Sequence, residues 1–325
     1  MAHAYEQLTH ERVLDAVESL GLLADGHIMA LNSYENRVFQ IGIEDDEGVV
    51  GKFYRPGRWS NEAILEEHAF SLALAGEEIP VIPPMPFKGR TLFEHAGFRF
   101  ALFPRRGGRT PDLENLDNLE WIGRFIGRIH LLGQAKTFLH RPQLDSQWYG
   151  RQARETLMQS PLLPDQYRET YQELAARLIS AIEQAFSQVQ PRPIRLHGDC
   201  HPGNILWTDA GPHFVDMDDS CNGPAVQDLW MMLSGEPMEM QIQLDALLEG
   251  YRAFHDFDTA ELALIEPLRS LRQLHYTAWL ARRWDDPAFP LAFPWFGEDS
   301  YWQGYLSDLD QQLLRMAEAP LQLYP

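Results

Sequence analysis

The sequence predicts an α+β fold in which a small β-rich N-terminal lobe precedes a larger helical C-terminal lobe. Short runs rich in Val, Ile, Phe and Tyr gather before residue 104, and helical periodicity dominates after residue 109. The chain of 325 residues also exceeds what one compact core usually holds. We therefore expect an N-terminal lobe at residues 1–103, a hinge at 104–109 and a C-terminal lobe at 110–325.

The N-terminal lobe alternates between helical and strand patterns. The acidic turn at 44–48 separates two apolar runs, which is typical of a hairpin. Ser60 or Asn61 can cap the second helix of the lobe. The expected elements are, in chain order, a helix at 7–24, strands at 28–31, 37–43 and 49–54, a helix at 60–76, and strands at 90–94 and 98–103.

Helical patterns cover most of the C-terminal lobe. We expect Asp228, in one of these helices, to be a buried carboxylate that accepts backbone N–H bonds from the loop around residue 199. The expected helices lie at 114–135, 165–188, 225–234, 238–255, 258–283 and 299–318, and short strands at 194–196, 205–207 and 213–215.

The composition argues against several classes of partner. The formal net charge of −20 disfavours nucleic acid, because contacts to phosphate require a positively charged face. The sequence contains no run of about 18 apolar residues, so no membrane span is predicted. The N-terminus lacks the basic and apolar regions of a secretory signal. Two cysteines, Cys200 and Cys221, fit a reducing compartment. We expect a cytoplasmic monomer with no nucleic-acid or membrane partner.

One segment of the C-terminal lobe carries the residues of phosphoryl transfer. Asp199 lies on a loop shaped by Gly198 and Pro202, and Asn204 follows at the start of a strand. A short turn returns the chain to a strand that ends at Asp216, so a hairpin brings Asn204 and Asp216 together. The reaction needs a carboxylate to orient the acceptor hydroxyl and hard oxygen ligands for Mg²⁺. The pattern predicts Asp199 as the catalytic base and Asn204 and Asp216 as Mg²⁺ ligands.

A cation for the nucleotide phosphates is expected upstream. Lys52 lies in the apolar strand at 49–54, and the helix at 60–76 contains Glu66 and Glu67. A lysine held by a helix glutamate presents a fixed positive charge to the phosphates of ATP. We favour Glu67 as its partner, because the apolar residues that follow it have the spacing of a buried helix face; Glu66 is the alternative.

The motif His-Gly-Asp-x-x-x-x-Asn at 197–204, followed by Val-Asp at 215–216, resembles the aminoglycoside phosphotransferase and choline kinase branch of the protein-kinase-like fold. The resemblance covers nearly the whole chain. It implies a two-lobed protein-kinase-like fold that uses ATP as co-substrate and Mg²⁺ as cofactor. Four further segments resemble a bacterial serine/threonine protein kinase of this branch, at 31–38, 52–56, 222–230 and 286–290.

Motif positions carry the roles of the family onto this chain. The resemblance implies that Asp199 accepts the proton, that Asp216 is both catalytic and a metal ligand with Asn204, and that Lys52 anchors the phosphates. The arginine that reads an activation-loop phosphate in protein kinases is absent, because the triplet at 197–199 is His-Gly-Asp. Activation by phosphorylation is therefore not expected.

The N-terminal lobe departs from the family pattern in the loop that is expected to cover the phosphates of ATP. The residues at 32–36, Asn-Ser-Tyr-Glu-Asn, stand where related kinases have a glycine-rich loop. Ser33 is the only small hydroxyl there, so we expect it to bind a phosphate oxygen of ATP. Phe103, where the last strand meets the hinge, is expected to contact the nucleotide as well.

The sequence leaves the acceptor and two smaller questions open. The chain is predicted to phosphorylate a protein hydroxyl, with a small alcohol (choline, homoserine or an aminoglycoside) as the alternative acceptor. A silent nucleotide-binding scaffold is disfavoured, because the catalytic set is intact. Asp218 either helps to hold a second Mg²⁺ or is a solvated turn acid. The basic stretch at 104–109 is either a solvated turn or a loop that faces phosphate or substrate.

Overall fold

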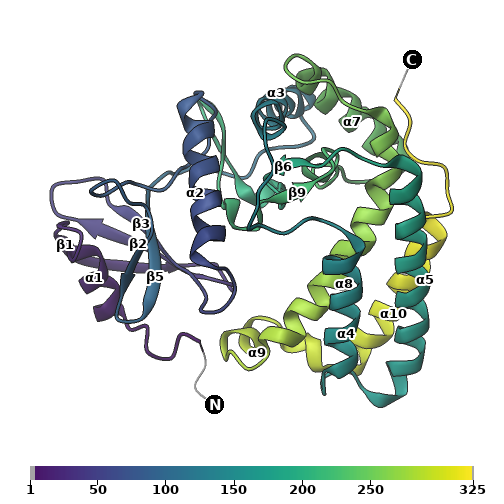
Figure 1. The fold of residues 1–325 in the computed structure, drawn as a ribbon, viewed down its shortest axis with the longest axis horizontal. Helices are drawn as coiled ribbons and strands as arrows, with labels where there is room; N and C mark the ends of the chain where they lie inside the picture. The colour runs from purple at the N-terminus through teal and green to yellow at the C-terminus, as the bar shows by residue number, and fades with distance from the viewer. Residues whose placement is uncertain (1–3, 324–325) are drawn as a thin grey trace. The chain divides into compact units, whose positions relative to one another are not determined.

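The structure is a computed structural model that describes residues 4–323 and contains two compact units (Figure 1). The sheet unit consists of Met1–Pro111, Leu139–Arg141 and Pro202–Ser220. The helical unit consists of Asp112–Phe138, Pro142–His201 and Cys221–Pro325. The α+β class is confirmed, with the sheet in the N-terminal part of the chain and most helices after it. The hinge expected at 104–109 stays a prediction.

A five-stranded antiparallel sheet forms the first unit, in the order β1-β2-β3-β5-β4. Strand β2 alternates between buried and more exposed residues, β3 and β5 are buried over most of their length, and the core includes Phe39, Ile41, Phe53 and Phe100. Helix α1 (His10–Glu18) packs Val13, Ala16 and Val17 against the same core. The strands are β1 (Ala24–Leu31), β2 (Arg37–Ile43), β3 (Val49–Phe53), β4 (Phe93–His95) and β5 (Phe98–Pro104).

Two further elements complete the sheet unit. Helix α2 (Asn61–Gly76) begins at the expected cap, where Ser60 Oγ accepts a hydrogen bond from Ala63 N at 3.2 Å. The hairpin of β7 (Ile205–Thr208) and β8 (Gly211–Phe214) joins this unit through main-chain bonds. Ile82 N donates to the carbonyl of Phe214 at 3.0 Å. The late hairpin is therefore part of the N-terminal sheet unit, although more than 100 residues separate them in sequence.

The helical unit contains the remaining elements. Helices α4, α5, α8 and α10 lie side by side in it, and β6 (Ile194–Leu196) pairs antiparallel with β9 (Cys221–Gly223) (Figure 1). No helix within residues 4–323 is both long and apolar enough to cross a membrane. The helices are α3 (Leu116–Gly133), a π-helix (Gln147–Arg151), α4 (Gln152–Gln159), α5 (Asp165–Val189), α6 (Gln227–Trp230), α7 (Pro237–Arg252), α8 (Ile265–Arg283), α9 (Ala288–Ala292) and α10 (Asp299–Arg315), with 3₁₀ turns at Pro202–Asn204, Met217–Asp219, Thr259–Leu264 and Pro294–Gly297.

The sequence-based prediction missed some helices for identifiable reasons. The π-helix and α4 at 147–159 bury only Gly150, Ala153 and Leu157, so they show little apolar periodicity. The pattern expected as one helix at 258–283 is a 3₁₀ turn followed by α8. Pro267 accounts for the break, because proline is tolerated in the first turn of a helix but not in its interior.

Helices α3 and α7 approach one another through glycines. A Cβ atom at Gly123 would lie 1.9 Å from the carbonyl oxygen of Leu247, and one at Gly250 would lie 1.9 Å from that of Glu120. Backbone atoms cannot move aside as a flexible side chain can. Only glycine therefore permits this crossing, which fixes the helix that carries His130, a contact of Asp228 described below.

Gly123→Ala is expected to destabilise the protein by about 1–3 kcal/mol, because the added methyl overpacks the crossing of α3 and α7. Gly304→Ala on α10 is the matched control, since no atom lies within 4 Å of its added Cβ. There the better helix propensity of alanine should stabilise by about 0.5–1 kcal/mol. Thermal unfolding of both variants measures the two effects, and equal shifts of the same sign would contradict the packing argument.

Candidate active site

Lys52 and Asp216 form an ion pair at the centre of the sheet unit. Lys52 lies on β3 with its side chain 7% exposed, and its Nζ is 2.8 Å from Asp216 Oδ1 and 3.3 Å from Asp218 Oδ1. Burial alone would lower the pKa of Lys52, but the charges of Asp216 and Asp218 hold that pKa above its usual value. The lysine therefore stays positively charged, although it is buried.

The β7–β8 hairpin brings Asn204 beside Asp216. Val215 N donates to the carbonyl of Asn204 at 3.0 Å, so Asn204 lies across the hairpin from the residue before Asp216. Asp216 has a backbone φ of 60°, in the left-handed region that non-glycine residues seldom adopt. Residues held in such conformations cluster at functional sites. The hairpin predicted from the spacing of the motif is confirmed.

A cavity of about 410 Å³ in the sheet unit contains most of the predicted nucleotide and metal residues. One part of its wall is apolar and includes Val50, Phe103 and Leu206. The other part is polar and includes Ser33, on the loop between β1 and β2, and the ion pair of Lys52 and Asp216. The polar lining residues are Asn32, Ser33, Lys52, Glu67, Arg106, Asn204 and Asp216.

The two glutamates of α2 have different environments. Glu66 accepts hydrogen bonds from the backbone nitrogens of Leu139, His140 and Arg141 at 2.8–3.2 Å, so it anchors that segment. Glu67 is 1% exposed and lies in the electrostatic field of Lys52. Burial raises the pKa of Glu67 to about 7, although the charge of Lys52 opposes this shift. Among the described residues Lys52 pairs with Asp216 and Asp218 and not with a glutamate of α2. Of the two glutamates it is Glu67 whose charge acts on Lys52, and its role as the partner of the lysine stays a prediction.

Asp218 is the centre of a buried ionic network. Its carboxylate pairs with Arg58, accepts a hydrogen bond from Asn36 Nδ2 at 3.0 Å and faces Lys52. Arg141 donates to the backbone carbonyl of Asp218. Burial would raise the pKa of Asp218, but the cations around it hold the pKa well below its usual range. With a side chain 4% exposed, Asp218 is not the solvated turn acid that was one of the two expectations.

The basic stretch at 104–109 is exposed, yet two of its residues have defined contacts. Arg106 lines the cavity of the sheet unit. Arg109 exchanges backbone hydrogen bonds with Trp207 on β7, at 3.0 and 2.7 Å. The stretch thus pairs with the β7–β8 hairpin at Arg109 and supplies one cation, Arg106, to the cavity. Of the two expectations for this stretch, Arg106 fits a loop that faces a ligand, and the other residues fit a solvated turn.

Asp199 lies in the helical unit, where two donors meet its carboxylate. Arg272 Nη1 on α8 donates to Asp199 Oδ1 at 2.5 Å, and His201 Nε2 is 3.5 Å from Oδ2. Burial would raise the pKa of Asp199, but the hydrogen bond from His201 and the charge of Arg272 hold it well below its usual range. Asp199 is therefore ionised near neutral pH. The sequence left open whether Arg272 is a solvated residue of its helix or lines an acceptor site, and it did not predict the contact with Asp199.

The loop that carries Asp199 is fixed by a buried carboxylate. Asp228, which is 1% exposed, accepts hydrogen bonds from the backbone nitrogens of His197 and Gly198 at 2.8 Å each. His130 Nε2 lies 3.0 Å from the same carboxylate. The structural role expected for Asp228 is confirmed. Cys200, the residue after Asp199, is buried, and burial raises the pKa of its thiol well above the usual value.

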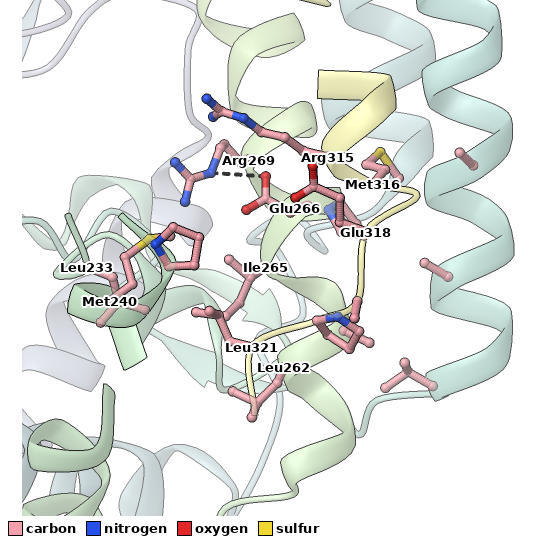
Figure 2. A pocket seen from close by; sticks show the side chains of 18 of the residues that line it. Leu233, Met240, Leu262, Ile265, Glu266, Arg269, Arg315, Met316, Glu318 and Leu321 are labelled. Atoms are coloured by element: carbon pink, nitrogen blue, oxygen red, sulfur yellow. Dashed lines mark ion pairs between the residues drawn. The ribbon is translucent and has the colours of Figure 1, made fainter. Parts of the chain in front are cut away.

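A larger cavity of about 700 Å³ in the helical unit contains none of the predicted site residues. Figure 2 shows Arg269, Arg315, Glu266 and Glu318 gathered at one end of it, with Leu321 and other apolar side chains at the other. Arg269 Nε is 3.3 Å from Glu266 Oε2. The charged residues that line the cavity are two arginines and three glutamates, because Glu236 lines it as well.

The sequence profile described as the phosphotransferase enzyme family matches residues 27–265, most of the chain. The chain belongs to the phosphotransferase enzyme family. Among curated relatives of this phosphotransferase, stress response kinase A of Escherichia coli (strain K12) is 45% identical over 324 residues, covering 100% of this chain and 98% of the relative. A protein named serine/threonine protein kinase RdoA, of Salmonella typhimurium (strain LT2), is 44% identical over the same length and coverage.

Solved structures confirm the kinase-like fold. An amicoumacin kinase, hAmiN, solved with AMP-PNP, Ca²⁺ and amicoumacin, has a TM-score of 0.75 at 19% identity and covers 97% of this phosphotransferase and 96% of its own chain. A microcompartment-associated aminopropanol kinase has a TM-score of 0.71 at 20% identity, with coverage of 96% and 100%. The family resemblance noted in the sequence is confirmed by the family profile and by the curated relatives.

Several residues of the charged cluster escaped sequence reasoning. Arg58 follows β3 by five residues and pairs with Asp218 and Asp219. Its place in a short basic segment of an acidic chain was the one signal in the sequence that could have pointed to it. Asn36 lay inside the loop that was singled out for Ser33. Nothing in the local sequence around Arg141 indicates its contact with Asp218, since the two are 77 positions apart.

Glu67→Gln is expected to change how stability depends on pH. The pKa of Glu67 rises from 4.5 to about 7 on folding, so the folded wild type binds a proton that the unfolded chain has released between these values. Wild-type stability attributable to this group is therefore complete below pH 4.5 and is lost as pH rises through 7. The variant lacks the group, so its stability relative to wild type should increase from pH 5 to 8 by on the order of 3 kcal/mol.

Urea unfolding at several pH values measures this difference. Glu94→Gln is the control, because Glu94 is an exposed residue of β4 in the same unit. Its stability should follow the wild-type curve at every pH. Parallel curves for Glu67→Gln and wild type would show that Glu67 does not titrate in this window.

Proposed function

We propose that this phosphotransferase is an ATP- and Mg²⁺-dependent serine/threonine protein kinase with Asp199 as its catalytic base. The observation that carries the proposal is the buried Lys52–Asp216 pair, which opens with Asn204 onto a cavity that has an apolar wall. A cation, two oxygen ligands and an apolar surface in one cavity are the requirements of a magnesium nucleotide.

The cavity offers a place for each part of ATP. Phe103, Val50 and Leu206 supply an apolar surface for the adenine ring. Lys52 supplies a fixed positive charge for the phosphates, and the loop with Ser33 covers the same side. Lys52 and Asp216 are each other's counterions in this structure. A magnesium nucleotide would give each of them a new partner of opposite charge, so the exchange leaves no charge buried alone.

The residues present fit a magnesium ion. The side chain of Asp216 is 51% exposed, and Asp216 and Asn204 both line the cavity. Mg²⁺ is held by one or two protein oxygens and completes its coordination with water and substrate phosphates. Asp216 and Asn204 would hold it, and the ion would neutralise charge on the phosphates. A second ion at Asp218 stays a prediction.

Asp199 is proposed to act on the acceptor. In the reaction the oxygen of the acceptor hydroxyl forms a bond to the γ-phosphorus, the bond from that phosphorus to the β–γ bridging oxygen breaks, and ADP leaves. The hydroxyl proton passes to Asp199 and then to solvent. A carboxylate whose pKa is held low accepts a proton weakly, so Asp199 contributes mainly by orienting the hydroxyl and takes the proton as the new bond forms.

The relatives support a protein acceptor. The name of the Salmonella relative, 44% identical along the whole chain, describes a serine/threonine protein kinase. The solved structures whose names mention small acceptors are 20% identical or less, and they support the fold alone. A small alcohol is the second candidate, favoured by the net charge of −20, which attracts cationic molecules. The buried, unbridged Cys200 and Cys221 support the proposed cytoplasmic location.

Variants at the two acids should separate catalysis from nucleotide binding. Asp199→Asn should lower phosphoryl transfer roughly 10²–10⁴-fold while MgATP affinity stays near that of wild type, because the residue acts on the acceptor. Asp216→Ala and Asn204→Ala should instead remove the Mg²⁺ dependence of ATP binding. Transfer is measured with γ-labelled ATP and a generic protein substrate, and binding by calorimetry with Mg²⁺ and with EDTA.

Asp209→Asn is the matched control, because Asp209 is an exposed carboxylate in the turn between β7 and β8. It should leave both measurements unchanged. Asp199→Asn with more than about a tenth of wild-type turnover would remove Asp199 from this role. A wild-type difference between Mg²⁺ and EDTA in both metal-ligand variants would place the metal elsewhere.

Ser33→Ala is expected to weaken ATP binding. Among residues 4–323 the structure gives Ser33 Oγ no hydrogen-bond partner, so the hydroxyl is not committed to its own turn. Losing a hydrogen bond to a charged phosphate costs about 1.5–3 kcal/mol, which is roughly ten- to a hundredfold in kcat/KM for ATP. Ser33→Thr keeps the hydroxyl and should retain most of the activity. A loss below about twofold in Ser33→Ala would leave Ser33 as a turn residue without a role in binding.

A further inference from the structure

The carboxylate of Asp199 is already engaged by a cation in this structure. Arg272 Nη1 donates to Oδ1 at 2.5 Å, and His201 approaches Oδ2 at 3.5 Å. If Asp199 orients the hydroxyl of the acceptor, as proposed above, that hydroxyl must share or replace the contact with Arg272. The acceptor therefore meets a guanidinium group at the point of reaction.

Arg272 can leave Asp199 at little cost. Its side chain is 46% exposed and that of Asp199 is 23% exposed. Ion pairs exposed to this degree contribute about 0–1 kcal/mol, because solvent screens them. The pair is therefore not a strong structural anchor. The loop of Asp199 has a separate support in Asp228, which holds the backbone of His197 and Gly198.

Arg272 lies on a helix that is rich in arginine, within an acidic protein. The chain has a net charge of −20, yet helix α8 contains four arginines and one glutamate (Arg269, Arg272, Arg282, Arg283 and Glu266). Arg269 pairs with that glutamate, whereas Arg272 pairs with Asp199. A cationic acceptor would approach this helix against its charge. An anionic group would find in Arg272 a partner that can bind it through two parallel hydrogen bonds.

We infer that Arg272 determines acceptor specificity, by selecting a hydroxyl that has an anionic group beside it. When such an acceptor binds, the anionic group takes the guanidinium of Arg272, and Asp199 is left to orient the hydroxyl. The chemistry corresponds to a serine or threonine flanked by acidic residues in a protein, or to a small hydroxy acid. It disfavours cationic alcohols of the choline or aminoglycoside type. The inference rests on the proposed function and names its substrate class.

Peptide phosphorylation tests the inference in the full-length protein. Two peptides with the same central serine are compared, one flanked by aspartates and one flanked by lysines, with γ-labelled ATP and Mg²⁺. A hydrogen bond to a charged group is worth about 1.5–3 kcal/mol, so wild type should prefer the acidic peptide roughly ten- to a hundredfold in kcat/KM. Arg272→Gln should lose that preference, and Arg272→Lys should retain part of it.

Arg252→Gln is the matched control, because Arg252 is an exposed arginine at the end of α7. It removes the same charge elsewhere in the helical unit and should keep the wild-type preference. Thermal unfolding of all variants shows whether they are folded. Equal use of both peptides by wild type, or an unchanged preference in Arg272→Gln, would overturn the inference.

A small-molecule pair distinguishes the two sources of the same chemistry. Glycerate, an anionic alcohol, is compared with choline, a cationic one. Glycerate used better than either peptide, with dependence on Arg272, supports the inference with a small hydroxy acid as acceptor. The acidic peptide used best supports it with a protein as acceptor. Choline used best, or no transfer to either anionic acceptor, overturns it.

The pH profile separates a role in specificity from a role in structure. The titratable and charged groups that contact Asp199 include His201 on its own loop and Arg272 on α8. Removing the positive charge of Arg272 should move the acidic limb of kcat/KM to higher pH, because the pKa of Asp199 rises towards its usual value. If the acidic limb of kcat/KM lies at the same pH in Arg272→Gln and in wild type, Arg272 does not act on Asp199 and the inference is overturned. If Arg272→Gln still transfers phosphate with the wild-type preference, the inference is contradicted and the proposed function stands. If the wild-type protein shows no Mg²⁺-dependent ATP binding, the proposed function itself is contradicted.

Discussion

The buried charges around Lys52 are the constraint on which the sheet unit depends. Lys52, Arg58 and Arg141 carry positive charge into a region where Asp216 and Asp218 carry negative charge. Removing one partner of a buried pair costs about 3–5 kcal/mol, because the other charge is left uncompensated. Strand β3, the hairpin β7–β8 and the segment 139–141 are therefore held in one arrangement by electrostatics as well as by packing.

The same network places functional groups in one cavity. Asn36 ends the loop that contains Ser33, and it binds Asp218, which lies two residues beyond Asp216. The loop that is proposed to cover the phosphates and the proposed metal ligand are thereby linked through one buried carboxylate. In the helical unit Asp228 has the corresponding role, because its carboxylate accepts hydrogen bonds from the backbone of His197 and Gly198 and so fixes the loop of Asp199. In each unit a buried acid lies beside a more exposed acid that is proposed to take part in the reaction, Asp218 with Asp216 and Asp228 with Asp199.

Much of this arrangement could be predicted, and the failures have physical causes. The hairpin of β2 and β3, the cap at Ser60, the β7–β8 hairpin and the burial of Asp228 follow from local spacing, which sequence displays directly. The short helices near 150 and 290 bury few large residues and leave little periodicity. The contacts of Arg58, Arg141 and Arg272 could not be found, because ion pairs between distant positions depend on the fold and leave no local pattern.

Cys200 gives the loop of Asp199 a chemical property of its own. Its thiol is 1% exposed, and burial raises its pKa, so the reactive thiolate is scarcely formed and is not reached by solvent. Peroxides and electrophiles attack thiolates that are both ionised and accessible. A cysteine placed directly beside the proposed catalytic base is thereby inert, and oxidising conditions that inactivate many enzymes through an active-site thiol would leave this loop intact.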